Sequence, residues 1–205
     1  MQIWWIELIK ISPALITTVF VVMLVIANRK TLRGMLDRMT KFKGLGIEAE
    51  FASKEMDNAI ANQKVTVSTH DRSSALKRLA MMAPLLRYAR LLWVDNEPAR
   101  TKSERAMLEK VGARITTVKT SAEAERELKE NEYLMVLTDL DREGKATEGL
   151  EFVKRTVANK THRWTIAYVE TGQWGLPRPP YLFAITNRPD HLIHYVCDVA
   201  ERERL

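Results

Sequence analysis

Acidic side chains directly follow two apolar runs in this chain. The run "YLMVLT" ends at Asp139, with Asp141 two positions on, and "RLLWV" ends at Asp95, with Asn96 and Glu97 behind it. An acid at such a place can simply cap the end of a strand. It can also serve chemistry, because two carboxylates brought together supply the oxygen ligands that Mg²⁺ prefers. Asp95 and Asp139 are therefore the leading candidates for a metal site.

Other reactive residue types give weaker indications. His191 and His194 lie three positions apart in a helical stretch, but no matching Cys or second carboxylate pair accompanies them. Cys197 is the single cysteine, which excludes an internal disulfide and suits a small buried hydrophobe. The sequence contains no Gly-rich phosphate loop and no Ser-His-Asp arrangement. We therefore do not expect an enzyme.

The elements that must position these acids alternate between strands and helices from residue 90 onward. The runs that predict strands are "RLLWVD", "ARITTV", "YLMVLTD", "WTIAYVE" and "YLFAIT". Helices are predicted between them, one closed by Gly112 and another opened by the capping pattern Thr120-x-x-Glu123. Such alternation predicts a parallel sheet with helices on both faces, which binds ligands at the carboxyl ends of its strands. The residues at those ends are Asp95, Asp139, Glu170 or Thr171, and Asn187.

Residues 90 to about 200 resemble a response-regulator receiver domain. The resemblance rests on "LLWVDNEPARTKSERAMLEKVGARITTVKTSAEAERELKENEYLMVLTDLDRE" and, near the end, on "AITNRPDHLIHYV". It implies a flavodoxin-like fold with a five-stranded parallel sheet, and it places Asp139 at the phosphoacceptor position. It also implies that Asp95 is one of two acids that help to hold Mg²⁺, and that Asp141 contributes its backbone carbonyl to that ion.

The metal-binding and output parts depart from the family's pattern. Asn96 stands where the family has its second acid, with Glu97 next along. The stretch "TGQWGLPRPP" stands where the family has its fourth helix, and its three prolines cannot sustain one. We therefore expect no switching by the family's usual route.

The phosphoryl-binding positions depart as well. Val169 stands where the family has a Ser or Thr, with Thr171 two positions later. Asn187 replaces the lysine of the fifth strand, with Arg188 adjacent. The expectation is a degenerate phosphoacceptor site that persists as an acidic pocket, with Mg²⁺ as the one cofactor it would hold.

The net charge of +6 is concentrated in one short block. Residues 29–43 contain six Lys or Arg against one Asp, about +5, so the rest of the chain is nearly neutral. A nucleic-acid surface spread over the domain is therefore not expected.

An uncharged stretch precedes that block. Residues 11–28, "ISPALITTVFVVMLVIAN", are long enough to cross a bilayer core, and Trp4 and Trp5 suit an interfacial belt. A cleaved signal peptide would carry its basic residues before the apolar run, and a buried soluble helix would have a polar face. We expect residues 1–30 to be a single-pass anchor in the inner (plasma) membrane, with the N-terminus outside and the chain from Arg29 onward in the cytoplasm.

Residues 31–89 are predicted as a juxtamembrane region. "TLRGMLDRMTKFK" suits a basic helix at anionic headgroups, and the alternation in "GLGIEAEF", residues 44–51, predicts a short strand. "ASKEMDNAIANQ" predicts a helix, "KVTVSTHDRSS" a linker, and "ALKRLAMMAPLLRYAR" a helical connector interrupted by Pro84.

The sequence thus predicts a membrane-anchored, receiver-like signalling or interaction module, with residues 90–205 as its receiver-like domain. Its partners would be the lipid bilayer and either another protein or a second copy of itself. Two alternatives stay open. The chain could be a working phosphoacceptor in a two-component relay, or a membrane effector whose cytoplasmic domain senses a small molecule or nucleotide.

Overall fold

The computed structural model describes residues 49–141, 148–159, 164–170 and 179–203, all within one unit that spans Leu45–Leu205. The predicted anchor, the basic stretch after it and most of the proline-rich segment lie outside these ranges. No helix within the described ranges is both long and apolar enough to cross a bilayer.

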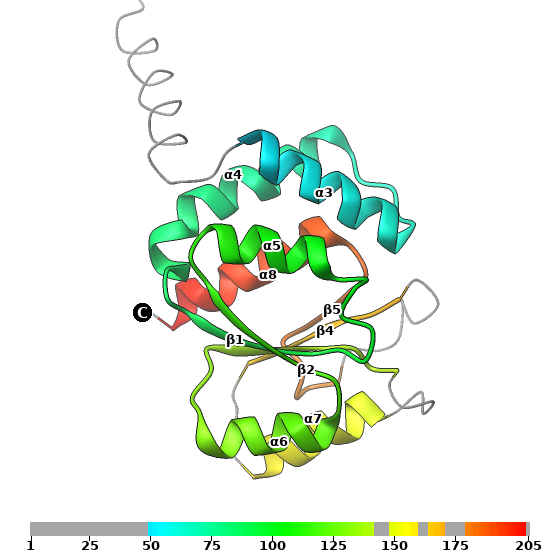
Figure 1. Cartoon of the computed structure of the whole chain (residues 1–205), viewed down its shortest axis with the longest axis vertical. Helices are drawn as coiled ribbons and strands as arrows, with labels where there is room; N and C mark the ends of the chain where they lie inside the picture. Colours follow the sequence, from blue (N-terminus) through cyan, green and yellow to red (C-terminus); the bar gives the residue numbers. More distant parts are fainter. Residues whose placement is uncertain (1–48, 142–147, 160–163, 171–178, 204–205) are drawn as a thin grey trace, which may run out of the picture. The chain divides into compact units, whose positions relative to one another are not determined.

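A five-stranded parallel sheet forms the centre of the unit (Figure 1). Its strands are β1 (Arg90–Val94), β2 (Arg114–Val118), β3 (Met135–Thr138), β4 (Thr165–Tyr168) and β5 (Ala184–Thr186). Their order in the sheet is β2-β1-β3-β4-β5, and each neighbouring pair is parallel. This order is that of the flavodoxin-like doubly wound fold. The predicted fold class is confirmed for the part of the chain that the structure describes.

The strand register brings the candidate site residues to one edge. Val94 of β1 is level with Thr138 of β3, and Tyr168 of β4 is level with Thr186 of β5. The residues that follow these four positions therefore emerge together at the carboxyl edge of the sheet. They are Asp95, Asp139, Val169 and Asn187.

Four helices cover the two faces of the sheet. Figure 1 shows α5 (Lys102–Lys110) and α8 (Pro189–Arg202) on one face, and α6 (Ser121–Glu130) and α7 (Glu148–Ala158) on the other. Helix α6 begins with the predicted capping box: the Thr120 hydroxyl accepts a hydrogen bond from the Glu123 N–H, and the Glu123 carboxylate accepts one from the Thr120 N–H. Gly112 follows α5 with φ +98°, the left-handed conformation that closes a helix.

Two further helices form an outer layer over α5 and α8. Helix α3 (Ala49–Gln63) packs on α5, and α4 (Thr69–Leu86) packs along α8 (Figure 1). Six apolar residues of α4 are buried: Ala75, Leu79, Ala80, Met82, Ala83 and Leu86. Because α8 is covered by the sheet on one side and by α4 on the other, its buried residues occur around most of its circumference.

Three local predictions in this outer layer were wrong. Residues 49–51, predicted as part of a strand, form the first turn of α3, because a helix buries Ala52, Met56 and Ala59 on one face and a five-residue alternation cannot. Residues 69–74, predicted as linker, are helical, since the Ser68 hydroxyl caps α4 by accepting the Asp71 N–H at 3.0 Å. Pro84 lies inside the last turn of α4 and does not interrupt it.

Candidate functional site

Asp139 lies buried directly after β3. Its N–H donates to the Val94 carbonyl at 3.2 Å, which continues the ladder between β3 and β1, and one of its carboxylate oxygens accepts the Asp141 N–H at 3.3 Å. Helix α7 closes over its backbone at Gly149, where a Cβ atom would lie 2.3 Å from the Asp139 carbonyl oxygen. A glycine is therefore required for α7 to approach the acidic loop so closely.

Asp95 lies buried directly after β1, and its carboxylate organises the following loop. Oδ1 accepts the N–H of Glu97 at 2.8 Å, and Oδ2 accepts the Thr101 hydroxyl at 2.7 Å. Arg105 in turn donates to the Thr101 hydroxyl oxygen at 2.6 Å. Asp95 thus holds the conformation of the loop between β1 and α5. Arg100 lies in this loop.

Arg100 places a guanidinium group between the ends of β3 and β4. Its Nη2 donates to Oδ2 of Asp139 at 2.9 Å, and its Nη1 pairs with the Glu170 carboxylate. The Asn62 side chain at the end of α3 donates to the Arg100 carbonyl at 3.2 Å, so the outer layer contacts this loop. The acidic edge therefore contains its own fixed cation, because a guanidinium is always charged in proteins.

The charge state of Asp139 reflects two opposing influences. Burial raises its pKa above the ordinary value, while the Asp141 N–H and the Arg100 guanidinium lower it. The pKa remains raised on balance, with the nearby Asp95 charge adding to the effect of burial. Arg100 thus offsets only part of the desolvation of a buried carboxylate.

The residues at this edge do not fit a Mg²⁺ ion in this arrangement. Mg²⁺ needs a near-octahedral set of oxygens and is usually bound by carboxylates together with water. Here one oxygen of Asp139 faces the Arg100 guanidinium, and both oxygens of Asp95 accept hydrogen bonds from the loop. Among the described residues, no group of three or more His, Cys, Asp or Glu side chains has metal-binding geometry.

The other predicted residues fall into two groups. Asn187 is buried at the end of β5 and Val169 is buried at the end of β4, whereas Asn96 and Glu97 are exposed on the loop after β1. The side chain of Asp141 is also exposed, and Thr171 lies outside the described residues. The structure thus assembles Asp95, Asp139, Arg100 and Glu170 at one edge.

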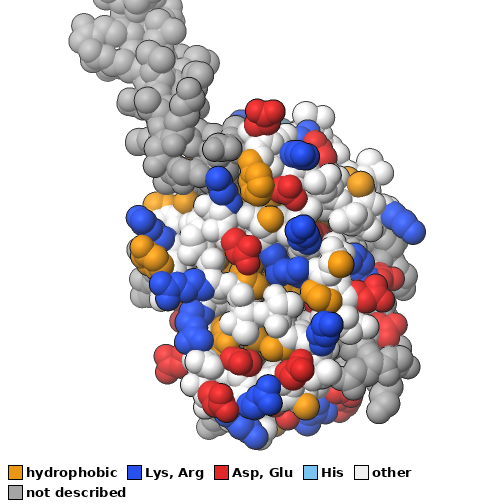
Figure 2. Space-filling model, in the orientation of Figure 1, with side chains coloured by type: hydrophobic (Ala, Val, Ile, Leu, Met, Phe, Trp, Pro, Cys, Tyr) orange, Lys and Arg blue, Asp and Glu red, His pale blue; other side chains and the backbone are white. Residues whose placement is uncertain are grey.

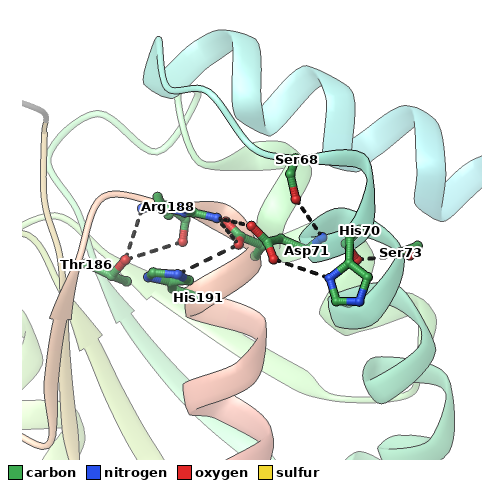
Figure 3. A network of polar contacts seen from close by, with 8 residues as sticks. Ser68, His70, Asp71, Ser73, Thr186, Arg188 and His191 are labelled. Atoms are coloured by element: carbon green, nitrogen blue, oxygen red, sulfur yellow. Dashed lines mark hydrogen bonds and ion pairs between the residues drawn. The ribbon is translucent and has the colours of Figure 1, made fainter.

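Arg188 is not part of this assembly, because it engages the start of α4. Its Nη2 donates to Asp190 at 2.6 Å and to Asp71 at 3.1 Å, and its N–H donates to the Thr186 hydroxyl at 3.0 Å. Figure 3 shows Arg188 lying between Thr186 and the Ser68–Ser73 turn of α4. The residue adjacent to the family's lysine position therefore joins two helices.

The reactive residues of α8 have structural surroundings. His191 lies 3.9 Å from Asp190, and His194 lies beside Arg78. Burial raises the pKa of the Cys197 thiol to about 12, as expected for a thiol packed in a core.

A buried acid that sequence reasoning missed lies on α5 beneath the site. Glu104 is fully buried, and its Oε1 accepts the Tyr168 hydroxyl at 2.7 Å. Burial raises the pKa of Glu104 and also that of Tyr168. The spacing of Glu104 with Met107, Leu108 and Val111 would have placed it on the buried face of the helix. No comparable pattern marks Arg100.

No model of a protein family matches the sequence, and no curated protein matches it. Solved structures do. The response regulator TrrA of Thermotoga maritima, in complex with Mg²⁺ and BeF, is 20% identical with a TM-score of 0.47, over 54% of this chain and 98% of TrrA. A CheY-like receiver domain protein of Methanospirillum hungatei is 20% identical with a TM-score of 0.44, over 57% of this chain and 98% of its own.

The response regulator PhyR of Brucella abortus is 19% identical with a TM-score of 0.45, over 67% of this chain and 58% of PhyR. Proteins of one fold can have unrelated functions at such identities. The function of this chain therefore has to be argued from its own site.

Proposed function

We propose that this chain is a membrane-anchored, receiver-like signalling or interaction module whose phosphoacceptor position is degenerate. The contact between Arg100 and Asp139 is the observation that carries the proposal. A receiver aspartate must present a free carboxylate oxygen to the phosphoryl donor while a divalent cation neutralises the transferred group. Here a fixed guanidinium already pairs with one oxygen of Asp139.

The surrounding positions support the same conclusion. Asn187 offers a neutral amide where a lysine would stabilise an acyl phosphate, and Val169 offers no hydroxyl. The Arg100 pairing with Glu170 also connects the ends of β3 and β4 without a phosphate. The module would therefore rest permanently in one arrangement and act through the surfaces it presents.

Phosphotransfer to Asp139 tests the degenerate site. The full chain, incubated with acetyl phosphate and Mg²⁺, is expected to gain no hydroxylamine-sensitive phosphoryl group by intact mass, while a competent receiver in the same reaction does. Asp139→Asn serves as the matched variant. A label on the wild-type chain that Asp139→Asn loses would contradict the proposal and support the two-component relay.

Membrane anchoring is supported by the uncharged run at residues 11–28 and the basic block after it. The full chain is expected to stay with the membrane fraction after alkaline carbonate extraction. Val22→Arg combined with Leu24→Arg is expected to release it, because charges near the middle of a span oppose insertion. Release of the wild-type chain by carbonate would contradict the anchor and leave the Asp139 experiment unaffected.

A further inference from the structure

A second charged surface lies at the opposite end of the sheet from Asp139. It comprises Arg87 and Tyr88 after α4, Arg90 at the start of β1 and Arg114 at the start of β2, and we call it the arginine edge. Arg90 and Arg114 are level in the register of β1 and β2, so both lie at the amino ends of their strands. All four side chains are exposed.

The backbone holds Tyr88 outward in an unusual conformation. Tyr88 has φ +69°, a left-handed value that non-glycine residues adopt at an energetic cost of order 1 kcal/mol. Its N–H donates to the Gly112 carbonyl at 2.8 Å, and its side chain is 60% exposed. A tyrosine fixed in this way presents a large amphipathic ring to the surroundings.

Guanidinium groups flank the exposed ring. The Cζ atoms of Arg87 and Arg114 lie 5.3 and 5.1 Å from the centre of the Tyr88 ring, and Arg90 lies 4.9 Å from the ring of Tyr133. Among the residues that the structure describes, these arginines form no ion pair with a carboxylate, although Glu109 and Glu132 are exposed on neighbouring segments. Their charge is therefore available to an anionic partner. Figure 2 shows Lys and Arg side chains bordering apolar ones where α4 ends and β1 begins, toward the left of the view.

The chain enters the unit beside this surface. The ring of Phe51, in the first turn of α3, lies 5.4 Å from the Lys110 ammonium at the end of α5. Lys110 lies two residues before Gly112, whose carbonyl accepts the Tyr88 N–H. A Cβ atom at Gly112 would lie 3.2 Å from the Arg87 side chain. In the sequence, Lys43 is the last residue of the basic block and precedes Ala49 by six residues. The described part of the chain thus begins near the Lys110 end of α5, at the same end of the sheet as the arginine edge.

We infer that the arginine edge binds the anionic phospholipid headgroups of the membrane that holds the anchor, an inference that rests on the proposed function. Guanidinium groups bind phosphate oxygens bidentately, and tyrosine rings suit the depth of the headgroups. A nucleic acid fits less well, because residues 44–205 carry only about one net positive charge once the block at 29–43 is subtracted from +6. Docking by this edge would turn the carboxyl edge, with Asp139 and Arg100, away from the bilayer.

A fluorescent reporter in the full chain tests the inference. Cys197 is buried, so a cysteine introduced as Glu109→Cys can be labelled selectively with an environment-sensitive dye. In nanodiscs that contain phosphatidylglycerol, the emission is expected to shift to the blue and to return at high salt. The same dye on Glu97→Cys, at the other end of the sheet, is expected not to respond, and neutral phosphatidylcholine nanodiscs are expected to give no shift.

Paired charge removals supply the decisive comparison. Arg87→Ala with Arg114→Ala is expected to abolish the shift and to weaken co-flotation with anionic vesicles about 25-fold, since each arginine contributes roughly a factor of five. Arg126→Ala with Lys129→Ala removes equal charge from exposed positions of α6 and is expected to change neither. The inference would be overturned if the emission shifted equally in anionic and neutral nanodiscs, or if both double variants lost the shift to the same extent. It would also be overturned if the emission shifted only when DNA was added. If the full chain does not insert into the nanodiscs, the proposed anchor is contradicted. Co-flotation with preformed anionic vesicles still shows whether the arginine edge binds anionic headgroups.

Discussion

At the scale of single residues, the site depends on how a buried carboxylate is neutralised. Asp139 is buried, its pKa is raised, and among the described residues it pairs with Arg100 at 2.9 Å. Removing one partner of a buried pair usually costs more than the pair contributes, because the remaining charge is left desolvated. This cost can be measured as a change in the free energy of unfolding, which requires no knowledge of the signal that the module receives.

Arg100→Ala is expected to lower the free energy of unfolding by about 2–3 kcal/mol, because Asp139 then lacks its cation. Asp139→Asn should cost less, and the double variant should cost less than the sum of the two. Urea unfolding of all four proteins gives the coupling energy. Mg²⁺ is expected to stabilise Arg100→Ala and to leave the wild-type chain unchanged. A coupling near zero, or equal stabilisation of both proteins by Mg²⁺, would show that Arg100 does not neutralise this site.

Glu104 gives a prediction about pH. Its folded-state pKa is raised by burial above the ordinary 4.5, so the folded chain holds this proton more tightly than the unfolded chain does. The stability that the protonated form contributes is therefore complete below the unfolded pKa and is lost as the pH rises through the folded pKa. Glu104→Gln stays neutral, and its amide oxygen can still accept the Tyr168 hydroxyl.

At neutral pH, Glu104→Gln is expected to be more stable than the wild-type chain by about 1–3 kcal/mol, the scale of a poorly partnered buried charge. The difference should shrink as the pH falls toward the unfolded pKa. Taking the difference between the two proteins at each pH removes the contributions of the titrating groups that both proteins share. Parallel curves would mean that Glu104 does not titrate differently in the folded state.

At the scale of elements, Arg188 in the turn between β5 and α8 holds the start of α4 against α8. Arg188 holds the pKa of Asp71 below its usual range by donating a hydrogen bond to it, and Arg78 of α4 donates to Asp198 of α8 at 2.6 Å. The Arg188 contact lies in the first turn of α4 and the Arg78 contact near its middle, and most of the buried apolar residues of α4 follow Arg78. The outer layer is therefore joined to the edge of the sheet that carries Asn187.

Arg188→Ala is expected to speed amide hydrogen exchange in the first turn of α4 by roughly twofold to fivefold, the effect of losing a partly exposed ion pair. Hydrogen exchange measured by mass spectrometry on peptides that cover residues 69–75 gives this rate directly. Arg155→Ala, which removes the ion pairs of Arg155 with Glu125 of α6 and with Glu148 of α7, is the matched control and should leave those peptides unchanged. Unchanged exchange in Arg188→Ala would mean that apolar packing alone holds the start of α4.

The elements of the sheet could be predicted from sequence because each strand is a short apolar run with a cap or glycine nearby, as at Thr120 and Gly112. The meeting of Asp95 and Asp139 could be predicted as well, since parallel strands place their carboxyl ends together. The Arg100 contact could not, because the path of a loop depends on tertiary hydrogen bonds such as Thr101 to Asp95. The left-handed Tyr88 has no local signature, since glycine or asparagine is the usual residue there.

At the scale of the whole molecule, the outer layer belongs to the same unit as the sheet. The sequence suggested a domain boundary at residue 90, because the alternation of strands and helices begins there. Yet Leu79 and Leu86 of α4 are buried, and α8 is buried on the side that faces α4 as well as toward the sheet. Removal of α3 and α4 would expose a broad apolar surface on α5 and α8.

A chain of residues 89–205 is therefore expected to aggregate or to bind a hydrophobic dye strongly, because a large exposed apolar face promotes association. A chain of residues 45–205 keeps the outer layer and is expected to be monodisperse, with a cooperative thermal transition. Size-exclusion chromatography and dye fluorescence compare the two, and Leu79→Asp in the longer chain should reproduce the behaviour of the shorter one by opening the α4 and α8 interface. A monodisperse, cooperatively folding chain of residues 89–205 would show instead that α3 and α4 are a separable cover, and that the receiver-like fold begins at β1.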